Sequence, residues 1–218
     1  MRQVYSYQSN LLNAMKADTI PTSWSDLWYI VKSNFTEPTP SVRHKKPVVV
    51  PPGIYTFLYR LTDATLHHDP SGEVVMEDTP FELQTHLGFV MQARGRVLVT
   101  GLGLGCVIRG LLANPHVEHI TCIEDSDDVL KLVGSYMPKE RLTIIEADAL
   151  EWTASNKEPF DCAWHDLWTD RGNGEPHLDL WHARLLMNCR AMIKRQGAWA
   201  FDRRAKKSLM RHGFHWMG

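Results

Sequence analysis

Cysteine is scarce in this chain, and long apolar runs are missing from it. Four of the 218 residues are cysteines, they lie far apart, and no two have the CxxC spacing of a zinc or redox site. We therefore expect no disulfide framework and no metal site, and we predict a reducing, cytoplasmic compartment.

No apolar run approaches the roughly 18 to 20 residues of a membrane helix. Residues 1–25 also lack the apolar core and cleavage site of a secretory signal, so we expect no membrane association.

Net charge is nearly absent as well, at −1, but the charges are unevenly distributed. Residues 184–211 carry nine Lys or Arg side chains and a single acid, Asp202. A basic segment on an otherwise acidic chain predicts an acidic partner, nucleic acid included. A solvated helical face is the alternative interpretation of the same residues.

Apolar strands alternate with helices from Arg96 onward. The expected strands are 97–100, 119–123, 142–145 and 160–164, and the expected helices are 106–113, 127–136 and 178–195. This alternation predicts an α/β fold, a Rossmann-like, open and mostly parallel sheet with helices on both faces. Since little sequence follows Gly213, we expect a reduced carboxyl-terminal part, with residues 198–201 as a last strand or a helix junction.

The first part of the chain has a different pattern. Residues 1–35 are interpreted as helical pieces and residues 36–53 as a proline-rich connection, followed by a strand or helix, a strand and a helix at 54–66, 73–76 and 81–92. We predict two parts. Residues 1–92 form an amino-terminal extension or lid with a substrate-side segment, and residues 93–218 form the Rossmann-like domain with basic carboxyl-terminal helices.

Three glycines at alternate positions, from Gly101 to Gly105, follow the first of these parallel strands. A strand, a glycine turn and a helix together form a pocket for a nucleotide-like ligand. A phosphate-binding P-loop needs a Lys after its last glycine, but Cys106, Val107 and Ile108 follow here. The dinucleotide pattern GxGxxG needs a glycine where Cys106 stands, so its fit is incomplete. What the glycines predict is a close approach between backbone and ligand.

Acidic residues end the next three strands. Glu124 follows the second strand, Asp148 the third and Asp166 the fourth. A carboxylate at the end of the second strand accepts hydrogen bonds from ribose hydroxyls in dinucleotide and adenosyl binders alike. Each acid also has a structural interpretation, as a helix-start residue, a helix N-cap or an acceptor for loop amides. Because the carboxyl ends of parallel strands meet at one edge, we expect a single site there.

The segment from Arg94 to Trp168 resembles the class I S-adenosylmethionine-dependent methyltransferases and the spermidine synthase-like superfamily. The resemblance rests on the GxGxG turn, on the acids that close the strands and on the FDxxxxD string at 160–166. It implies S-adenosylmethionine as the cofactor. It also implies that the cofactor is bound by Gly101, Gly103, Gly105, Glu124, Asp148 and the amide of Ala149.

Asp166 matches the aspartate that, in spermidine synthases, binds and orients the nucleophilic amine. The chain then departs from that family, because its DSSDP loop is absent and TDRGNGEPH follows Trp168. As a whole the chain most resembles small uncharacterised methyltransferase-like proteins of bacteria and their viruses.

If the chain is an enzyme, we expect His165 beside Asp166 to take the proton of the amine, because a neutral imidazole titrates near physiological pH. Trp168 offers an aromatic face to a cation.

The segment before the first parallel strand provides further candidates. Its Asp-Thr-Pro stretch resembles the ETP stretch of guanidinoacetate-type methyltransferases, which implies a substrate-side place for Glu77, Asp78 and His86. A capping box formed by Thr79 and Glu82 is the alternative.

The predicted function is that of an S-adenosylmethionine-dependent methyltransferase that acts on a small molecule or an exposed amine. Three alternatives stay open: a spermidine synthase-like aminopropyltransferase, a nucleic-acid methyltransferase that uses the basic residues 184–211, and a non-catalytic binder of S-adenosylmethionine. A small-molecule substrate is the expected partner, and the sequence leaves oligomerisation open.

Overall fold

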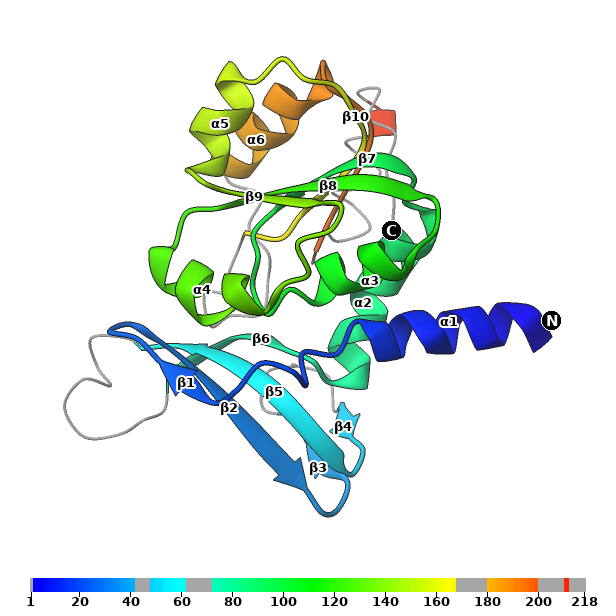
Figure 1. Cartoon of the computed structure of the whole chain (residues 1–218), viewed down its shortest axis with the longest axis vertical. Coiled ribbons are helices and arrows are strands. Elements are labelled where there is room, and N and C mark those ends of the chain that lie inside the picture. Colours follow the sequence, from blue (N-terminus) through cyan, green and yellow to red (C-terminus); the bar gives the residue numbers. More distant parts are fainter. Residues whose placement is uncertain (1, 42–47, 62–71, 168–179, 200–209, 212–218) are drawn as a thin grey trace.

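The computed structural model describes residues 2–41, 48–61, 72–167, 180–199 and 210–211. Figure 1 shows an antiparallel sheet in one half of the molecule and a parallel sheet with its helices in the other. Helix α1 lies at the side of the molecule, where the two halves meet.

The amino-terminal half is mostly strand. Its elements are α1 (Arg2–Ala14), β1 (Ser23–Trp24), β2 (Trp28–Phe35), β3 (Thr39–Pro40), β4 (Val49–Val50), β5 (Gly53–Arg60) and β6 (Glu73–Glu77). Strands β1, β2, β5 and β6 pair side by side in that order, all antiparallel, and β3 pairs with β4.

Part of the sequence prediction for this half was wrong. Residues 1–35 were expected to be helical, but only α1 is a helix and β2 is a full strand. Only Lys32 and Asn34 of its residues are exposed, and its aromatic and β-branched side chains favour a pleated strand. The strand expected at 73–76 is confirmed by β6, and β5 resolves the choice between strand and helix that the sequence left open.

The parallel half follows. Its elements are α2 (Pro80–Gln92), β7 (Gly95–Thr100), α3 (Cys106–Ala113), β8 (Val117–Glu124), α4 (Asp127–Leu132), the short 3-10 helix η1 (Gly134–Tyr136), β9 (Leu142–Glu146), α5 (Ala149–Ser155), β10 (Phe160–His165), α6 (Leu180–Arg190) and β11 (Ile193–Ala198). The strand order is β11-β10-β7-β8-β9, and every neighbouring pair is parallel. The expected Rossmann-like sheet is confirmed.

The expected helix over 178–195 extended too far. Helix α6 ends at Arg190, and β11 occupies residues that were assigned to the helix. Lys194 on β11 is exposed because this is an edge strand, hydrogen-bonded only to β10 among the described residues. Such a polar strand lacks the continuous apolar run of the central strands, which are buried on both faces.

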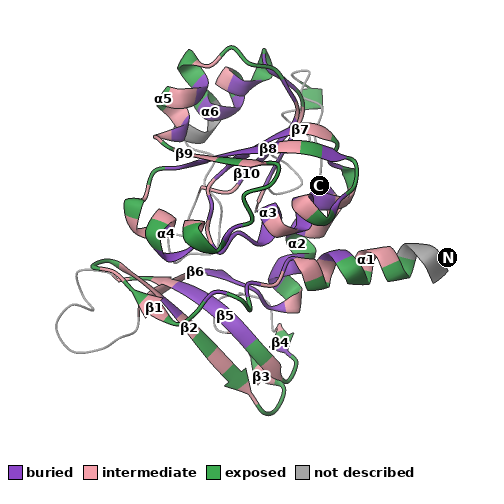
Figure 2. Cartoon of the chain, in the orientation of Figure 1, coloured by how far each residue is buried: buried purple, intermediate pink, exposed green. Residues whose placement is uncertain are grey.

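Apolar side chains fill both faces of the parallel sheet. On one face the core combines Leu11, Leu58 and Phe89 with the sheet residues Val97 and Ile120. Helices α5 and α6 cover the other face, where the second apolar cluster lies. Figure 2 shows buried residues gathered along β7, β8 and β10 and along parts of β5 and β6. Residues on both sides of position 92 therefore share one core, and the boundary itself stays a prediction.

Local chemistry explains where α2 begins. Thr79 is its N-cap, with the hydroxyl oxygen accepting the amide of Glu82 at 3.5 Å, and Pro80 occupies the first helical position.

None of the helices in the described ranges has the length and apolar character that a bilayer span requires.

Candidate active site at the switch in strand order

The strand order of the parallel sheet reverses between β7 and β10. The chain builds β8 and β9 on one side of β7 and then returns to place β10 and β11 on the other side. Thr100 and His165 are paired at the carboxyl ends of these two strands, so that Gly101 and Asp166 follow side by side. Ligands of open α/β sheets bind in the crevice at this position.

A cavity of about 530 Å³ opens at this edge. Its walls come from the glycine turn, from the segment after β8, from the end of β10 and from the antiparallel sheet. The lining residues are Leu27, Trp28, Leu58, Arg60, Val75, Met76, Glu82, Gly101, Gly103, Glu124, Asp125, Ser126, Asp127, Asp128, Val129, Asp166 and Leu167.

The glycine turn is shaped by close contacts within the protein. Gly101 has a φ of +93°, and a Cβ there would lie 2.1 Å from the carbonyl oxygen of Asp166. A Cβ on Gly103 would lie 2.4 Å from the Sδ of Met76, and that sulfur also accepts the amide of Leu104 at 3.2 Å. Gly101 and Gly103 line the cavity as expected. Gly105 caps α3 at a φ of +72° and is not among the lining residues.

Glu124 connects the glycine turn to α4. Its Oε2 accepts the amide of Leu102 at 2.7 Å, and its Oε1 accepts the amide of Ser126 at 3.0 Å. The side chain is almost fully buried, and this burial raises the pKa of the carboxyl group, an effect that the two amide hydrogen bonds oppose. The neighbouring Asp125 also raises this pKa, through its charge and a side-chain hydrogen bond. A carboxylate oxygen can accept more than one hydrogen bond, so the group can still accept one from a ribose hydroxyl.

Asp166 lies at the end of β10 with its side chain about one-fifth exposed, and it lines the cavity. Its amide donates to the carbonyl of Thr100 at 2.9 Å, which fixes the turn after the strand. Nε2 of His86 lies 4.0 Å from Oδ2 of Asp166 and 3.5 Å from Oε1 of Glu82. Helix α2 thus brings an imidazole and a second carboxylate to Asp166.

His165 lies inside the sheet and does not line the cavity. The side chain has no exposed surface, Nδ1 lies 3.0 Å from the Thr100 hydroxyl, and Nε2 lies 3.1 Å from Oε1 of Gln196. Burial lowers the pKa of its imidazole to about 4. With both ring nitrogens engaged, these contacts favour a structural place for His165, and its proton-accepting role stays a prediction.

Asp148 and Ala149 occupy the start of α5, outside the lining of the cavity. Oδ1 of Asp148 accepts the amide of Glu151 at 2.8 Å, which is the helix-capping role that the sequence offered as an alternative. Their contact with an adenine ring stays a prediction.

The three substrate-side candidates on and before α2 have different surroundings. Asp78 accepts the amides of Ala17 at 3.0 Å and Thr56 at 2.6 Å, and so ties the chain after α1 to β5. Glu77 accepts the hydroxyl of Thr79 at 2.6 Å. Neither lines the cavity, whereas His86 lies directly behind Asp166. Trp168 is outside the described residues, as are most of the basic residues after position 199.

Sequence reasoning missed Glu82, Met76, Trp28 and Arg60 as wall residues. Glu82 was interpreted only as part of a capping box. Its spacing of four residues from His86 puts both side chains on one face of a helix, and this was the available signal.

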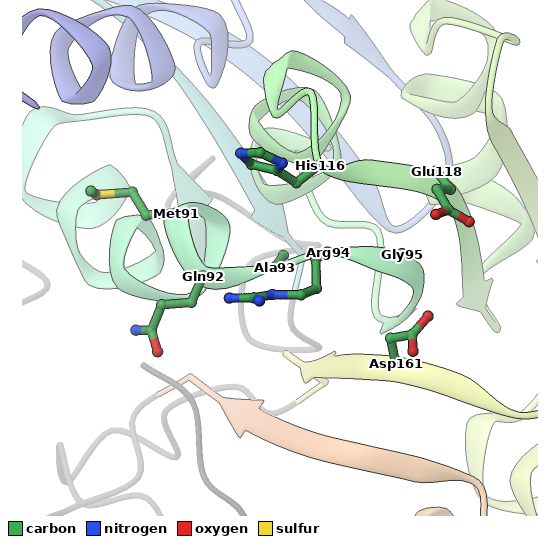
Figure 3. A pocket seen from close by; sticks show the side chains of 8 residues that line it. All are labelled: Met91, Gln92, Ala93, Arg94, Gly95, His116, Glu118 and Asp161. Carbon is green, nitrogen blue, oxygen red and sulfur yellow. The ribbon is translucent and has the colours of Figure 1, made fainter. Parts of the chain in front are cut away.

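A second hollow, of about 400 Å³, lies at the opposite ends of the strands, beside the starts of β7, β8 and β10 (Figure 3). Its polar side chains do not converge: Gln92 and Arg94 extend toward one side, and Asp161 and Glu118 lie at the other. The carboxylate of Asp161 already accepts the amide of Arg96 at 3.0 Å and Nζ of Lys194 at 2.6 Å. The site is therefore at the carboxyl ends of the strands.

Comparison with known proteins gives one sequence match. A polyamine aminopropyltransferase of Pseudomonas syringae pv. tomato is 29% identical over 103 residues, which are 43% of this chain and 36% of that protein. No family model matches the chain.

Two solved structures align with this chain at low similarity. Spermidine synthase from Thermotoga maritima is 17% identical and has a TM-score of 0.43, covering 81% of this chain and 53% of its own. Human methyltransferase-like protein 13 in complex with SAH is 16% identical, with a TM-score of 0.40, and covers 51% of this chain and 58% of its own. The chain spans about a third of the curated relative and little more than half of these two structures.

Proposed function

We propose that this chain binds S-adenosylmethionine in the cavity at the switch point and is a transferase that methylates an amine. The observation that carries the proposal is the convergence of Gly101, Glu124 and Asp166 on one cavity from the ends of three adjacent strands. The glycine turn allows close approach, Glu124 presents acceptors for a ribose, and Asp166 presents a carboxylate to a nucleophile.

The charge of the cavity supports a cationic occupant. Among the described lining residues Arg60 is the one basic side chain, and it lies over the ring of Trp28 at 5.7 Å. The acidic lining residues are Glu82, Glu124, Asp125, Asp127, Asp128 and Asp166. A sulfonium and a protonated amine are both stabilised by such a field, whereas a phosphate-bearing dinucleotide is repelled.

The residues of the chain would act mainly by orientation. Bound S-adenosylmethionine supplies a carbon that its sulfonium charge already activates. Glu124 would hold the ribose, and Asp166 would align the amine for in-line attack, because proximity and orientation lower the barrier of such a displacement. Leu58 and Met76 contribute a buried apolar part of the cavity wall.

Aminopropyl transfer is the second candidate, and the match to a polyamine aminopropyltransferase favours it. It uses the same sulfonium chemistry with a different transferred carbon. The sequence after Asp166 lacks the Ser-rich loop of the synthases, which favours methyl transfer. A nucleic-acid substrate remains a hypothesis, since most of the basic residues after position 199 are outside the described ranges.

Calorimetry tests the proposal directly. S-adenosylmethionine, decarboxylated S-adenosylmethionine, methylthioadenosine and NAD are titrated into the protein, and we expect an adenosyl sulfonium to bind most tightly. Between the two sulfonium compounds, preference for the decarboxylated one supports aminopropyl transfer. Preference for NAD, or no binding of any ligand, contradicts the proposal.

Variants separate the two roles of the acids. Glu124→Ala should raise the Kd of the adenosyl ligand by about tenfold or more, a loss of about 1.4 kcal/mol. Glu146→Ala is the matched control, because Glu146 is paired with Glu124 on the neighbouring strand, is exposed and does not line the cavity. Asp166→Asn should leave the Kd within about twofold and abolish transfer.

A further inference from the structure

Arg60 brings a positive charge to a cavity whose other charged wall residues are acidic. It is the last residue of β5, and it is paired with Trp28 on the neighbouring strand β2. Its guanidinium lies over the ring of this tryptophan, 5.7 Å from the centroid. Because an aromatic face attracts a cation, this contact favours one position of a long side chain. That position borders the cavity, since both residues line it.

The guanidinium of Arg60 keeps its N–H donors available. In the part of the chain that the structure describes, it has no hydrogen-bond or ion-pair partner besides the ring of Trp28. Asp127, which also lines the cavity, is paired with Lys131 instead. A planar guanidinium presents parallel N–H groups that match the two oxygens of a carboxylate.

The wall that carries Arg60 also contacts the glycine turn. Leu58 is two residues earlier on β5, so the two side chains are on one face of the strand and their Cα atoms are about 7 Å apart. Leu58 is paired with Met76 of β6, whose Sδ accepts the amide of Leu104 at 3.2 Å. Arg60 is therefore on the face of the antiparallel sheet that is turned toward the glycine turn.

The glycine turn itself has little to offer an anion. Four of its five amides donate within the protein, namely those of Gly101, Leu102, Leu104 and Gly105. The amide of Gly103 is the remaining one, without an acceptor among the described residues. A single N–H cannot match both oxygens of a carboxylate, so an anionic group of a ligand has its better partner in Arg60.

A single cation in an acidic cavity can discriminate between ligands that differ by one carboxylate. S-adenosylmethionine carries an α-carboxylate at its methionine end, and decarboxylated S-adenosylmethionine has the same adenosyl sulfonium without that group. The acidic wall attracts the sulfonium and the ammonium of both compounds. Without Arg60 the same wall would repel the carboxylate, and the cavity would prefer the decarboxylated compound.

We propose that Arg60 is a specificity-determining residue that binds the α-carboxylate of S-adenosylmethionine and so selects it over the decarboxylated compound. The inference rests on the proposed binding of an adenosyl sulfonium in this cavity. The bound ligand spans the cavity, with its ribose at Glu124 on the parallel sheet and its carboxylate at Arg60 on the antiparallel sheet. Selection by Arg60 disfavours aminopropyl transfer, which uses the decarboxylated compound.

Calorimetry on the full chain compares the two compounds. In the unchanged protein S-adenosylmethionine should bind about tenfold more tightly, as expected for hydrogen bonds between charged groups. Arg60→Met keeps the apolar stem and loses the charge, so the Kd of S-adenosylmethionine should rise about tenfold. The Kd of the decarboxylated compound should stay the same or fall, because a positive charge that repels it is gone. Arg60→Lys should keep part of the preference, since it retains the charge without the parallel N–H groups.

Lys32→Met is the matched control. Lys32 is an exposed residue of β2 in the same sheet, and it does not line the cavity. Its removal takes away the same charge without touching the ligand, so both Kd values should stay within about twofold. Methylthioadenosine, which has neither carboxylate nor ammonium, should bind all the proteins alike if the cavity keeps its shape.

The outcomes separate this inference from the proposed function. Binding of neither sulfonium compound to the unchanged protein contradicts both. Equal binding of the two compounds, or tighter binding of the decarboxylated one, overturns the role of Arg60 alone. So does an equal rise of both Kd values in Arg60→Met, because that result indicates a general role in the shape of the cavity. Should Arg60→Met fail to fold, Arg60→Gln is measured in the same way, and an unchanged preference in it overturns the assignment.

Discussion

Gly101 shows how a single residue holds the two sides of the switch point together. Its φ is +93°, and a Cβ would lie 2.1 Å from the carbonyl oxygen of Asp166, a backbone atom that cannot move aside cheaply. Gly101→Ala should therefore lower the free energy of unfolding by about 3 kcal/mol, combining about 1 to 2 for the backbone conformation with about 1 to 3 for overpacking. Urea unfolding measures the loss.

The control for this change is another glycine in the same half of the molecule. A Cβ on Gly134 would meet nothing closer than Cδ2 of Leu130 at 4.0 Å. Gly134→Ala should leave the free energy of unfolding within about 0.5 kcal/mol, as surface substitutions usually do. Equal losses in the two variants would mean that the approach of Asp166 to Gly101 is not what constrains the turn.

The buried imidazole of His165 should make the free energy of unfolding depend on pH. Burial lowers the pKa of its imidazole from 6.5 to about 4. The unfolded chain therefore takes up a proton at a higher pH than the folded protein does. Its contribution to stability is full above pH 6.5 and falls away as the pH drops toward 4. At about 1.4 kcal/mol per pKa unit, the loss is about 3 kcal/mol.

Urea unfolding at a series of pH values measures this contribution. In His165→Asn the difference in unfolding free energy between neutral and acidic pH should be smaller than in the unchanged protein by about 3 kcal/mol. His116→Asn, at an exposed position, serves as the control and should keep the full dependence. An unchanged dependence in His165→Asn would show that the imidazole is not held neutral in the folded state.

At the scale of elements, Asp78 joins three segments of the amino-terminal half. It follows β6, and its carboxylate accepts the amide of Ala17, after α1, and the amide of Thr56, in β5. Burial raises the pKa of this carboxyl group, and the hydrogen bonds from the two amides lower it because they stabilise the charged form. Asp78→Ala leaves both amides without their acceptor and should cost about 2 to 5 kcal/mol.

Hydrogen exchange measures this tie amide by amide. Asp78→Ala should speed exchange at Ala17 and Thr56 more than at residues of β8. Asp18→Ala, at an exposed position in the same connection, should change neither amide. Unaltered protection of both amides in Asp78→Ala would mean that other contacts hold the three segments together.

The elements also show how far sequence patterns can predict the fold. Strands β7, β8 and β10 are apolar and central, so their pattern predicted the sheet that the structure confirms. The residue types that follow these strands predicted a candidate site at the carboxyl ends. Strands β2 and β11 were missed. Each face of β2 mixes apolar and polar residues, and the edge strand β11 carries Lys194, Arg195 and Gln196 in succession, so local periodicity could not separate either strand from a helix.

The candidate site was predictable to a similar extent. Gly101, Glu124 and Asp166 line the cavity as the order of the strands implied. The wall residues Trp28 and Arg60 come from the other sheet, and no local pattern predicts which part of a distant sheet will face the switch point. His165 and Asp148 illustrate a second limit. His165 ends β10 as predicted, but the direction of its side chain depends on Gln196, which lies far away in the sequence. Asp148 lies two residues beyond the end of β9, where its side chain caps α5.

At the scale of the whole molecule, the two sheets are connected through one apolar core. Met15, just after α1, is fully buried, and its Cγ lies 2.6 Å from where a Gly110 Cβ would be on α3. Leu58 of the antiparallel sheet belongs to the same cluster as Ile120 of the parallel sheet. This packing implies that the chain before position 92 and the chain after it unfold together, although their sheets are separate.

Met15→Ala tests that coupling. Removing a buried methionine side chain should lower the free energy of unfolding by about 2 to 5 kcal/mol. If the molecule unfolds cooperatively, this loss of stability lowers the protection of amides in both halves. Under conditions where exchange occurs by global unfolding, the amides of Leu58 and Ile120 should lose the same protection. Tyr5→Ala, on the exposed side of α1, should affect neither. A loss confined to Leu58 would show that the two halves unfold separately, and that the antiparallel sheet can move away from the cavity without disturbing the parallel one.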